Sequence, residues 1–440
     1  MAPSLVVRTP AYAEPDRPPD STSSSTQLYP RILDHIQKSI AIIAVSDSSN
    51  SKGDCQTSDL KLPKSKDKVK TWNSLPLDIK YYILSKLSYL DLYRAKTQSK
   101  EFKDLIESKE FQGWRGKVQE GLLTTLYFFV RNSIWYCEGY DLITKAWMRL
   151  PPFTTLPNLD PDSFKDHSIC TAGCLFCANV GKDQEQLIVF NPLTRTHKEL
   201  PRLHHRRNPV LMHMIVHPKD NYYKLIVAGS SRLGDEHLSK KTEVYDSRTK
   251  LWKVTEELPG PLFALNEHQS GIHINGLLYC IAFLEGDRGK GLLVYNVAEE
   301  RWLPECTRPL PYSAISNIVQ LTENNGNIYL FSEIEQERRV EHRIDVLDQT
   351  LNEWKMVMTE TKIGNPGLQT YPEYTCVSFG DNKLCVYNTI EHHGVVYEVE
   401  TGLRCEMLAP PARSACGEMG FFSLNPLTFV FAPNFQGVEP

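Results

Sequence analysis

The spacing of apolar residues predicts helices in one short part of the chain. Between residues 72 and 118, Ile79, Ile83 and Leu87 recur at intervals of four, which places them on one stripe of a helix. Pro76 lies where this helix would begin, a position at which its missing N–H leaves no hydrogen bond unmade. Residues 72–118 therefore predict a small all-α module, marginally stable by itself because it is so short.

From Leu122 onward the helical period disappears, and short apolar runs alternate with polar turns as in an all-β domain. Within this region a pair of bulky residues seven positions apart recurs roughly every 50 residues, a period typical of repeat folds. The six pairs are Tyr140 and Trp147, Phe190 and His197, Tyr245 and Trp252, Tyr295 and Trp302, Leu347 and Trp354, and Tyr397 and Arg404. Chance does not explain four tryptophans at the same offset.

The seven-residue offset has a physical reason. If residues 247–250 form a four-residue turn, Tyr245 faces Trp252 directly across two antiparallel strands, a contact that contributes roughly 0.2–1 kcal/mol. Upstream of such pairs lie Asn275-Gly276 and Asn325-Gly326, the dipeptides that favour tight hairpins. Each unit is thus four strands, named a to d in chain order. Six such units predict a six-bladed β-propeller over residues 122–435.

The first unit begins late and leaves little room for its strand a. The apolar segment 420–431 follows the sixth unit, and we expect it to join the first unit and close the ring, which removes two open sheet edges.

The N-terminal region, residues 1–70, has a different composition. Its first part is rich in Pro, Ser and Thr, as in PDRPPDSTSSST, and predicts disorder. KLPKSKDKVK at 61–70 is interpreted as a solvated basic linker, with a nuclear import signal as the alternative.

Bulk charge and cysteine content limit the possible partners. The 49 basic and 53 acidic residues give a net charge of −4, which gives no reason to expect nucleic acid or an anionic membrane as partner. The 11 scattered cysteines fit a reducing compartment, so we expect the protein in the cytoplasm, the nucleus or both.

Two motifs together resemble a known family. The stretch SLPLDIKYYILSKLSYLDLYRAKTQSKEFKDLIESKEF (74–111) is similar to an F-box, and the repeats are similar to the degenerate kelch units of plant F-box/kelch-repeat proteins. NPLTRTHKELP (191–201) is closer to an F-box associated domain, so that label is an alternative. The resemblance covers residues 72–432.

The resemblance implies a substrate receptor of an SCF-type ubiquitin ligase. The F-box, residues 72–118, would dock an SKP-family adaptor and through it a cullin–RING ligase, while the propeller would hold an unknown target protein. We expect an exposed apolar ridge in the free chain, and the residues assigned to the adaptor are Leu75, Pro76, Ile79, Ile83, Leu84, Leu87 and Leu92.

The target is expected on the face that carries the b–c and d–a loops, because long variable loops on a rigid scaffold are where specificity is usually built. Ser332–Arg343 and Thr359–Tyr371 are examples of these predicted loops. The candidate target-binding residues are His204, His205, Arg206, Arg207, Tyr312 and Tyr371, with an acidic segment expected near the two arginines.

Two clusters suggest metal sites on spacing alone. One is His167, Cys170, Cys174 and Cys177. We favour buried thiols there, because an odd separation would put Cys174 and Cys177 on opposite faces of one strand. The histidines of 204–217 lack neighbouring carboxylates or cysteines at ligand spacing.

The sequence contains no phosphate-binding loop and no nucleophile or zinc-protease motif. We therefore expect no catalytic residue, no metal and no cofactor. Two alternatives stay open, a propeller scaffold without a ligase role and, less favoured, a propeller enzyme.

Overall fold

The structure is a computed structural model of the chain. The residues that it describes are 72–87, 89–115, 127–131, 134–141, 145–149, 169–180, 186–192, 194–217, 220–230, 239–260, 265, 269–284, 289–311, 316–336, 339–351, 353–363, 374–388, 393–408 and 440.

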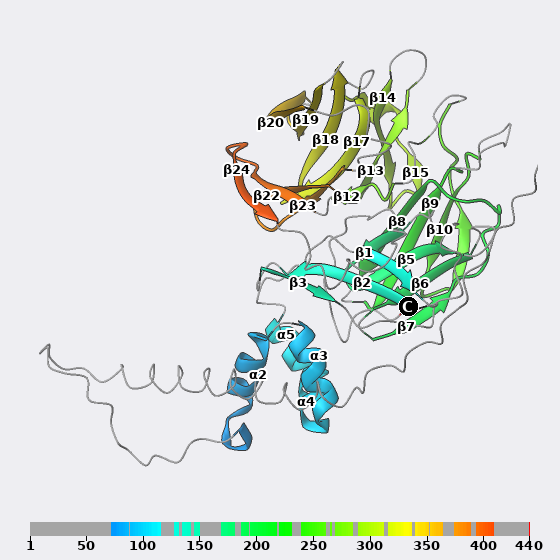
Figure 1. Ribbon diagram of the computed structural model, residues 1–440. Coiled ribbons are helices and arrows are strands. Elements are labelled where there is room, and N and C mark those ends of the chain that lie inside the picture. Colours follow the sequence, from blue (N-terminus) through cyan, green and yellow to red (C-terminus); the bar gives the residue numbers. More distant parts are fainter. Residues whose placement is uncertain are drawn as a thin grey trace, which may run out of the picture.

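The helical module contains a short 3-10 helix and four α-helices, grouped below the strands in Figure 1. They are η2 (Trp72–Ser74), α2 (Leu77–Ser85), α3 (Tyr89–Gln98), α4 (Lys100–Ile106) and α5 (Lys109–Arg115). Two serines separate the last three helices. The Ser99 hydroxyl accepts a hydrogen bond from the Phe102 N–H at 3.1 Å, and the Ser108 hydroxyl accepts one from the Phe111 N–H at 3.1 Å. Such caps satisfy N–H groups that a helix start leaves open.

The apolar side chains of the helices meet in a core that continues into the β domain. Tyr81, Leu84, Leu92, Ile106 and Phe111 are buried, and they belong to one cluster with buried residues of the second and third sheets. The helical module is therefore packed onto the propeller through apolar contact.

All the described strands form six antiparallel sheets, each built from consecutive strands. The first has three strands, β1 (Tyr127–Arg131), β2 (Ile134–Asp141) and β3 (Ala146–Arg149). The second sheet has β4 (Ile169–Ala172), β5 (Leu175–Val180), β6 (Gln186–Asn191) and β7 (Thr196–Glu199). The third has β8 (Leu211–His217), β9 (Tyr222–Ala228), β10 (Thr242–Asp246) and β11 (Leu251–Val254).

The remaining three sheets repeat this order. The fourth has β12 (Ile272–Ile274), β13 (Leu277–Phe283), β14 (Lys290–Asn296) and β15 (Arg301–Trp302), with η5 (Pro304–Cys306) and β16 (Arg308–Pro309) added. The fifth has β17 (Ser316–Asn324), β18 (Asn327–Gln336), β19 (Arg339–Asp348) and β20 (Glu353–Ile363). The sixth has β21 (Tyr374–Ser378), β22 (Lys383–Asn388), β23 (His393–Glu398) and β24 (Arg404–Leu408).

The predicted propeller is confirmed as an all-β architecture, but not with six complete blades. The described residues complete five four-stranded blades, and the β1–β3 sheet has only three strands. Strand β1 pairs with β2 and with no other described strand. The segment 420–431, which was expected to close the ring, lies outside the described residues.

All six predicted cross-strand pairs are confirmed as direct partners. The partners are Tyr140 and Trp147, Phe190 and His197, Tyr245 and Trp252, Tyr295 and Trp302, Leu347 and Trp354, and Tyr397 and Arg404. Two tryptophans also join neighbouring blades, because Trp252 Nε1 donates to the Pro201 carbonyl at 2.8 Å and Trp302 Nε1 donates to Thr242 Oγ1 at 3.0 Å. In the third and fourth blades the tryptophan thus packs within its own blade and hydrogen-bonds to the previous one.

The predicted turn chemistry is also present. Asn275-Gly276 and Asn325-Gly326 have positive φ at both residues, with φ near +51° at each asparagine. A left-handed residue also ends the c–d turns, as at Lys250, where the N–H donates to the Asp246 carbonyl at 2.8 Å. This conformation lets four residues reverse the chain between facing aromatic residues.

Two predicted loops were wrong. Most of Ser332–Arg343 belongs to strands β18 and β19, which pair along their length up to Gln336 and Arg339. Residues 359–363 likewise belong to β20. Charged residues masked these strands in the sequence, because both faces of this part carry polar side chains among the apolar ones.

Candidate adaptor-docking and target-binding surfaces

Helix α2 leaves a small apolar surface uncovered. The Leu77 side chain is 52% exposed and Tyr82 is 43% exposed, beside the exposed Pro76. Leu75 and Ile79 are half-buried. We call these five residues the α2 surface. It can supply apolar contact area to a helical partner.

The predicted ridge was wrong for the second half of the helix. Ile83 is 1% exposed, and Leu84, Leu87 and Leu92 are also buried in the described structure. The reason is that the stripe with four-residue spacing is the one that an amphipathic helix turns toward its own core. Only its beginning, at Ile79, reaches the surface, and the exposed Leu77 lies off that stripe.

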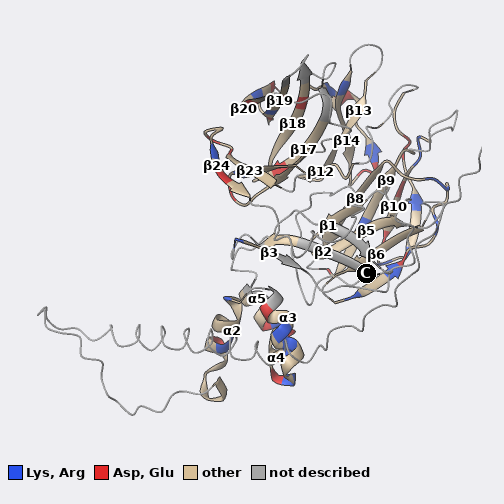
Figure 2. Ribbon diagram, in the orientation of Figure 1, with Lys and Arg blue, Asp and Glu red and all other residues tan. Residues whose placement is uncertain are grey.

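Polar contacts brace the start of α2 against α4. The Glu101 carboxylate accepts hydrogen bonds from Trp72 Nε1 at 3.2 Å and from Lys80 Nζ at 2.9 Å. The Trp72 ring lies 5.0 Å from the Phe102 ring, centroid to centroid. Lys86 lies over the Tyr82 ring at 5.3 Å. Figure 2 marks the positions of charged residues along the ribbon of the module, many of them on α3 and α4.

The predicted basic cluster lies on the d–a loop between β7 and β8. Arg207 is not at the surface, since its side chain is only 3% exposed and pairs with Glu243, whose side chain is fully buried. Arg207 also donates to the backbone carbonyls of Gly229, His205 and Lys241 at 2.7–3.0 Å. Its predicted role as a surface contact is therefore wrong, because every direction of its guanidinium is used inside the protein.

Glu243 also accepts hydrogen bonds from the backbone of the same loop. Its carboxylate accepts the backbone N–H of His204 at 2.8 Å and of His205 at 3.2 Å. His204 Nε2 lies 3.0 Å from the Trp252 carbonyl. Burial lowers the pKa of Arg207, and the Glu243 carboxylate opposes that shift. The loop is thus fixed by one buried ion pair and its hydrogen bonds.

The other predicted target-binding residues divide into two groups. His204, His205 and Arg206 are exposed, so their binding role stays a prediction. Tyr312 and Tyr371 lie outside the described residues. The sequence could not separate Arg206 from Arg207, because neighbouring arginines look alike until Glu243, distant in sequence, is placed beside one of them.

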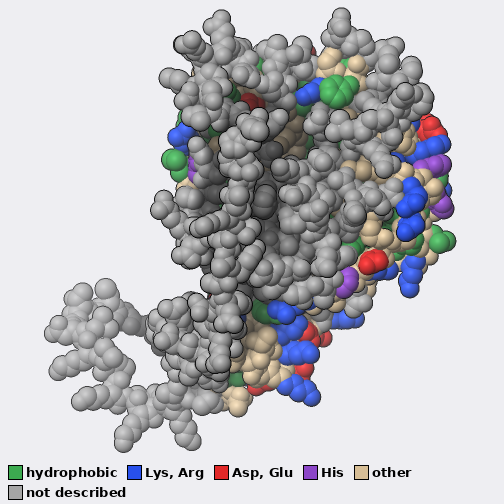
Figure 3. Space-filling view, turned by 45° about the vertical axis from the view of Figure 1, so that its right-hand side comes forward, with side chains coloured by type: hydrophobic (Ala, Val, Ile, Leu, Met, Phe, Trp, Pro, Cys, Tyr) green, Lys and Arg blue, Asp and Glu red, His purple; other side chains and the backbone are tan. Residues whose placement is uncertain are grey.

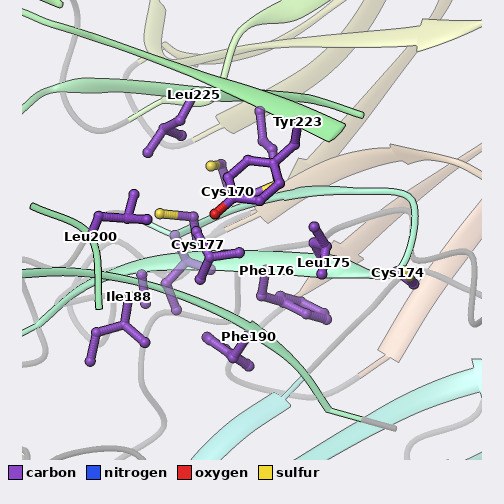
Figure 4. Packing of buried hydrophobic residues seen from close by; sticks show 14 of the residues in the cluster. Cys170, Cys174, Leu175, Phe176, Cys177, Ile188, Phe190, Leu200, Tyr223 and Leu225 are labelled. Carbon is purple, nitrogen blue, oxygen red and sulfur yellow. The ribbon is translucent and has the colours of Figure 1, made fainter. Parts of the chain in front are cut away.

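The cysteine cluster is part of the core. Cys170 on β4 pairs directly with Cys177 on β5, and both are fully buried, whereas Cys174 lies in the intervening turn rather than on the strand. Figure 4 shows Cys170 and Cys177 near Tyr223 and Cys174 apart from them. Burial raises the pKa of Cys174 to about 11 and that of Cys177 well above its usual value. These thiols therefore stay protonated at neutral pH.

The predicted histidine cluster is dispersed. His213 and His217 lie on β8 beside His273 of β12, with 6.0 Å between the ring centroids of His213 and His273. His167 lies outside the described residues. Within the described ranges, no group of three or more His, Cys, Asp or Glu is arranged to hold a metal ion. None of the described helices is both long and apolar enough to cross a membrane.

The fold defines a class of protein, a small helical module joined to a β-propeller. Residues 72–112 match the model of the F-box domain, and residues 137–433 match the model of the F-box associated beta propeller domain. The second match covers more than half of the chain, so the protein belongs to the F-box associated β-propeller family. Of the two repeat labels that the sequence suggested, this is the one that matches.

One curated relative is itself named an F-box protein. The chain is 24% identical over 239 residues to the F-box protein At2g21930 of Arabidopsis thaliana, and the match covers 52% of this chain and 59% of that protein. The chain thus spans less than two thirds of this curated relative. Among solved structures, a chain from a nidogen/laminin complex aligns with a TM-score of 0.40 and 10% identity, over 65% of this chain and 94% of that chain.

Proposed function

We propose that the protein is the substrate-recognition subunit of an SCF-type ubiquitin ligase. The α2 surface docks an SKP-family adaptor, the adaptor joins the chain to a cullin–RING ligase, and the propeller holds the protein to be ubiquitinated. Such a receptor acts by raising the concentration of target near the ubiquitin carrier and does no chemistry itself. It needs no cofactor and works in the cytoplasm, the nucleus or both.

The observation that carries this proposal is the α2 surface on an F-box that is packed onto a propeller. Leu77 and Tyr82 are exposed on the part of the chain that matches the F-box model, and they offer apolar contact area to a partner. The shared core of helices and blades gives the receptor a fixed geometry between adaptor and target. The propeller scaffold supplies the second, separate binding region.

We also propose that the propeller is closed by the C-terminal segment. The β1 edge has no partner strand in the described part of the chain, and an open edge strand invites pairing with another chain. The segment 420–431 is apolar and strand-like in sequence and would supply a fourth strand to the β1–β3 sheet. This would complete a six-bladed ring.

The adaptor assignment is tested by a pull-down with a purified SKP-family adaptor. Leu77→Arg and Ile79→Arg should each abolish capture, because each would place an unpaired charge in an apolar interface. Thr97→Arg, which adds the same charge at an exposed position on α3, is the matched control and should bind normally. Wild-type capture by both α2 variants would show that the adaptor does not use this surface.

A further inference from the structure

We propose that the d–a loop between β7 and β8 presents a preorganised cationic surface that docks an acidic segment of the target protein. The surface, here called the basic platform, comprises Arg202, His204, His205, Arg206 and Lys240. The identity of the partner as a ubiquitination target rests on the proposed function. The cationic surface itself does not, because it follows from burial and charge in the third blade.

The basic side chains of this loop divide into a buried one and several exposed ones. Arg207 and Glu243 neutralise each other inside the protein, with 2.5 Å between Nη1 and Oε1. The side chains of Arg202, His204, His205 and Arg206 are all exposed. No acidic residue occurs in the sequence between Glu199 and Asp220. The buried pair therefore shapes the loop without cancelling the charge that the loop displays.

The segment before β10 carries two further lysines. Lys240 and Lys241 precede β10 and lie beside this loop, since the Lys241 carbonyl accepts from Arg207. Lys241 pairs with Glu257. Lys241 chiefly, with His205 and Lys240, lowers the pKa of Glu257, so these basic side chains lie near one carboxylate. The side chain of Glu257 is about half exposed, so it does not close the platform to other anions.

The basic platform lies on one side of the third blade. The platform lies on the side of the third blade where b–c and d–a connections emerge, while the c–d turn with Arg248 and Lys250 emerges at the opposite end of the same strands. Figure 3 shows Lys, Arg and His side chains, with some acidic ones among them, along the right-hand margin of this face of the molecule. Arg248 is bound to Asp246 of its own turn, through three hydrogen bonds of 2.6–3.0 Å. The two basic groups of this blade therefore lie at opposite ends of its strands.

The chemistry of the basic platform indicates the kind of partner that it binds. Guanidinium groups bind carboxylates and phosphates through paired, directional hydrogen bonds. A rigid loop loses little conformational entropy on binding, so even exposed charges can contribute to affinity. The net charge of −4 for the whole chain disfavours a general polyanion partner. An extended segment rich in Asp, Glu or phosphoserine fits this chemistry.

The experiment measures fluorescence anisotropy of a fluorescein-labelled peptide of alternating glutamate and serine, titrated with the full-length protein at low salt. A glutamine–serine peptide and a phosphoserine version are the comparison probes. We expect the glutamate peptide or the phosphoserine peptide to bind, the glutamine peptide not to bind, and the affinity to fall with added salt. Binding of only one anionic peptide identifies which anion the platform prefers, and absence of binding by both contradicts the proposal.

Two variants locate the binding. Arg202→Gln with Arg206→Gln should weaken binding roughly fivefold, the effect of losing two exposed ion pairs. Arg248→Gln with Lys250→Asn removes the same charge from the opposite face, with asparagine chosen because residue 250 has φ of +58°. This control should bind like the wild type. An equal loss in both double variants would mean nonspecific attraction and would overturn the proposal.

Glu243→Gln separates a preorganised loop from simple charge. Removing a negative charge should strengthen anion binding if only net charge matters. We expect weaker binding instead, because the loop loses its clamp; stronger binding would contradict preorganisation. If this variant does not fold, the double variants above still decide the location. A single-stranded oligonucleotide that bound as well as the peptides would overturn the assignment to a protein segment. No adaptor is present, so failure here leaves the adaptor pull-down as a separate test.

Discussion

The helical module and the third blade use charged residues in opposite ways. In the module, Lys80 and Glu101 pair at the surface, with side chains 13% and 47% exposed, and the interior is apolar. In the third blade, Arg207 and Glu243 pair inside, almost fully shielded from water. The same residue types thus brace a surface in one region and fix a loop in the other. A cluster of charged residues in a sequence therefore indicates a binding surface only through those members whose side chains are exposed.

The largest expected effect is on the whole propeller. Deleting residues 417–440 should lower stability by more than about 5 kcal/mol, since several apolar side chains would lose burial at about 1.5–3 kcal/mol each. Because the helices share a core with the second and third blades, their unfolding should follow in the same calorimetric transition. Removing as many residues from the N-terminus is the control. Unchanged melting after the C-terminal deletion would contradict ring closure.

The next largest effect compares the two ion pairs directly. Glu243→Gln should cost about 3–5 kcal/mol in urea unfolding, because it leaves the Arg207 charge buried without a counterion. Glu101→Gln should cost less than about 1 kcal/mol, since its partners are reached by water. Equal costs for the two substitutions would show that burial does not separate these pairs.

A smaller effect should appear on acidification of the third blade. Burial lowers the pKa of His213 to about 4, and the ring of His273 lies 6.0 Å away. The unfolded chain therefore binds a proton at His213 below about pH 6.5, while the folded chain does so only near pH 4. As the pH falls from about 6.5 to about 4, the free energy of unfolding should decrease by up to about 3 kcal/mol, and below pH 4 it should level off.

The measurement for this prediction is urea unfolding at a series of pH values, with His213→Gln for comparison. Between pH 6.5 and 4, the slope of the unfolding free energy against pH should be smaller in this variant, by the equivalent of about one bound proton. The groups nearest to His213 are His273, the Ser270 carbonyl and, beyond His273, His217. A variant with the same slope as the wild type would assign the dependence to another group.

The smallest effect on stability is expected at the α2 surface. Leu77→Arg should change unfolding free energy by no more than about 0.5 kcal/mol, since the side chain is already half in water. Leu84→Arg, about two turns further on in a buried position, should prevent folding of the module because the charge would have no partner. Circular dichroism melting distinguishes the two. A destabilised Leu77→Arg would mean that Leu77 is part of the core.

Sequence alone predicted what depends on local pattern. The aromatic pairs and Asn-Gly turns are set by neighbours within one blade, and all six pairs proved to be direct partners. The fate of Ile83 could not be predicted in the same way, because an apolar stripe fits a partner's groove and the helix's own core equally well. Arg207 poses the same problem, since Glu243 lies on a strand beyond an intervening hairpin.

The long fifth blade was missed for a different reason. Residues 332–343 contain only two apolar side chains, Ile334 and Val340, among charged and polar ones, and the sequence there has no Gly or Asn to signal a turn. Pairing along β18 and β19 nevertheless continues through this polar segment, up to Gln336 and Arg339. Such extension depends on tertiary context rather than on local propensity.

The central claim, that this chain is a ligase receptor, is tested most directly by assembly. The full-length protein, an SKP-family adaptor and a cullin–RING module should be mixed and their mass measured by light scattering during size-exclusion chromatography. The account predicts one complex containing each component once, formed by the wild type and the Thr97→Arg control and lost in Leu77→Arg. A wild-type chain that elutes alone, with the adaptor and cullin assembled without it, would contradict the account.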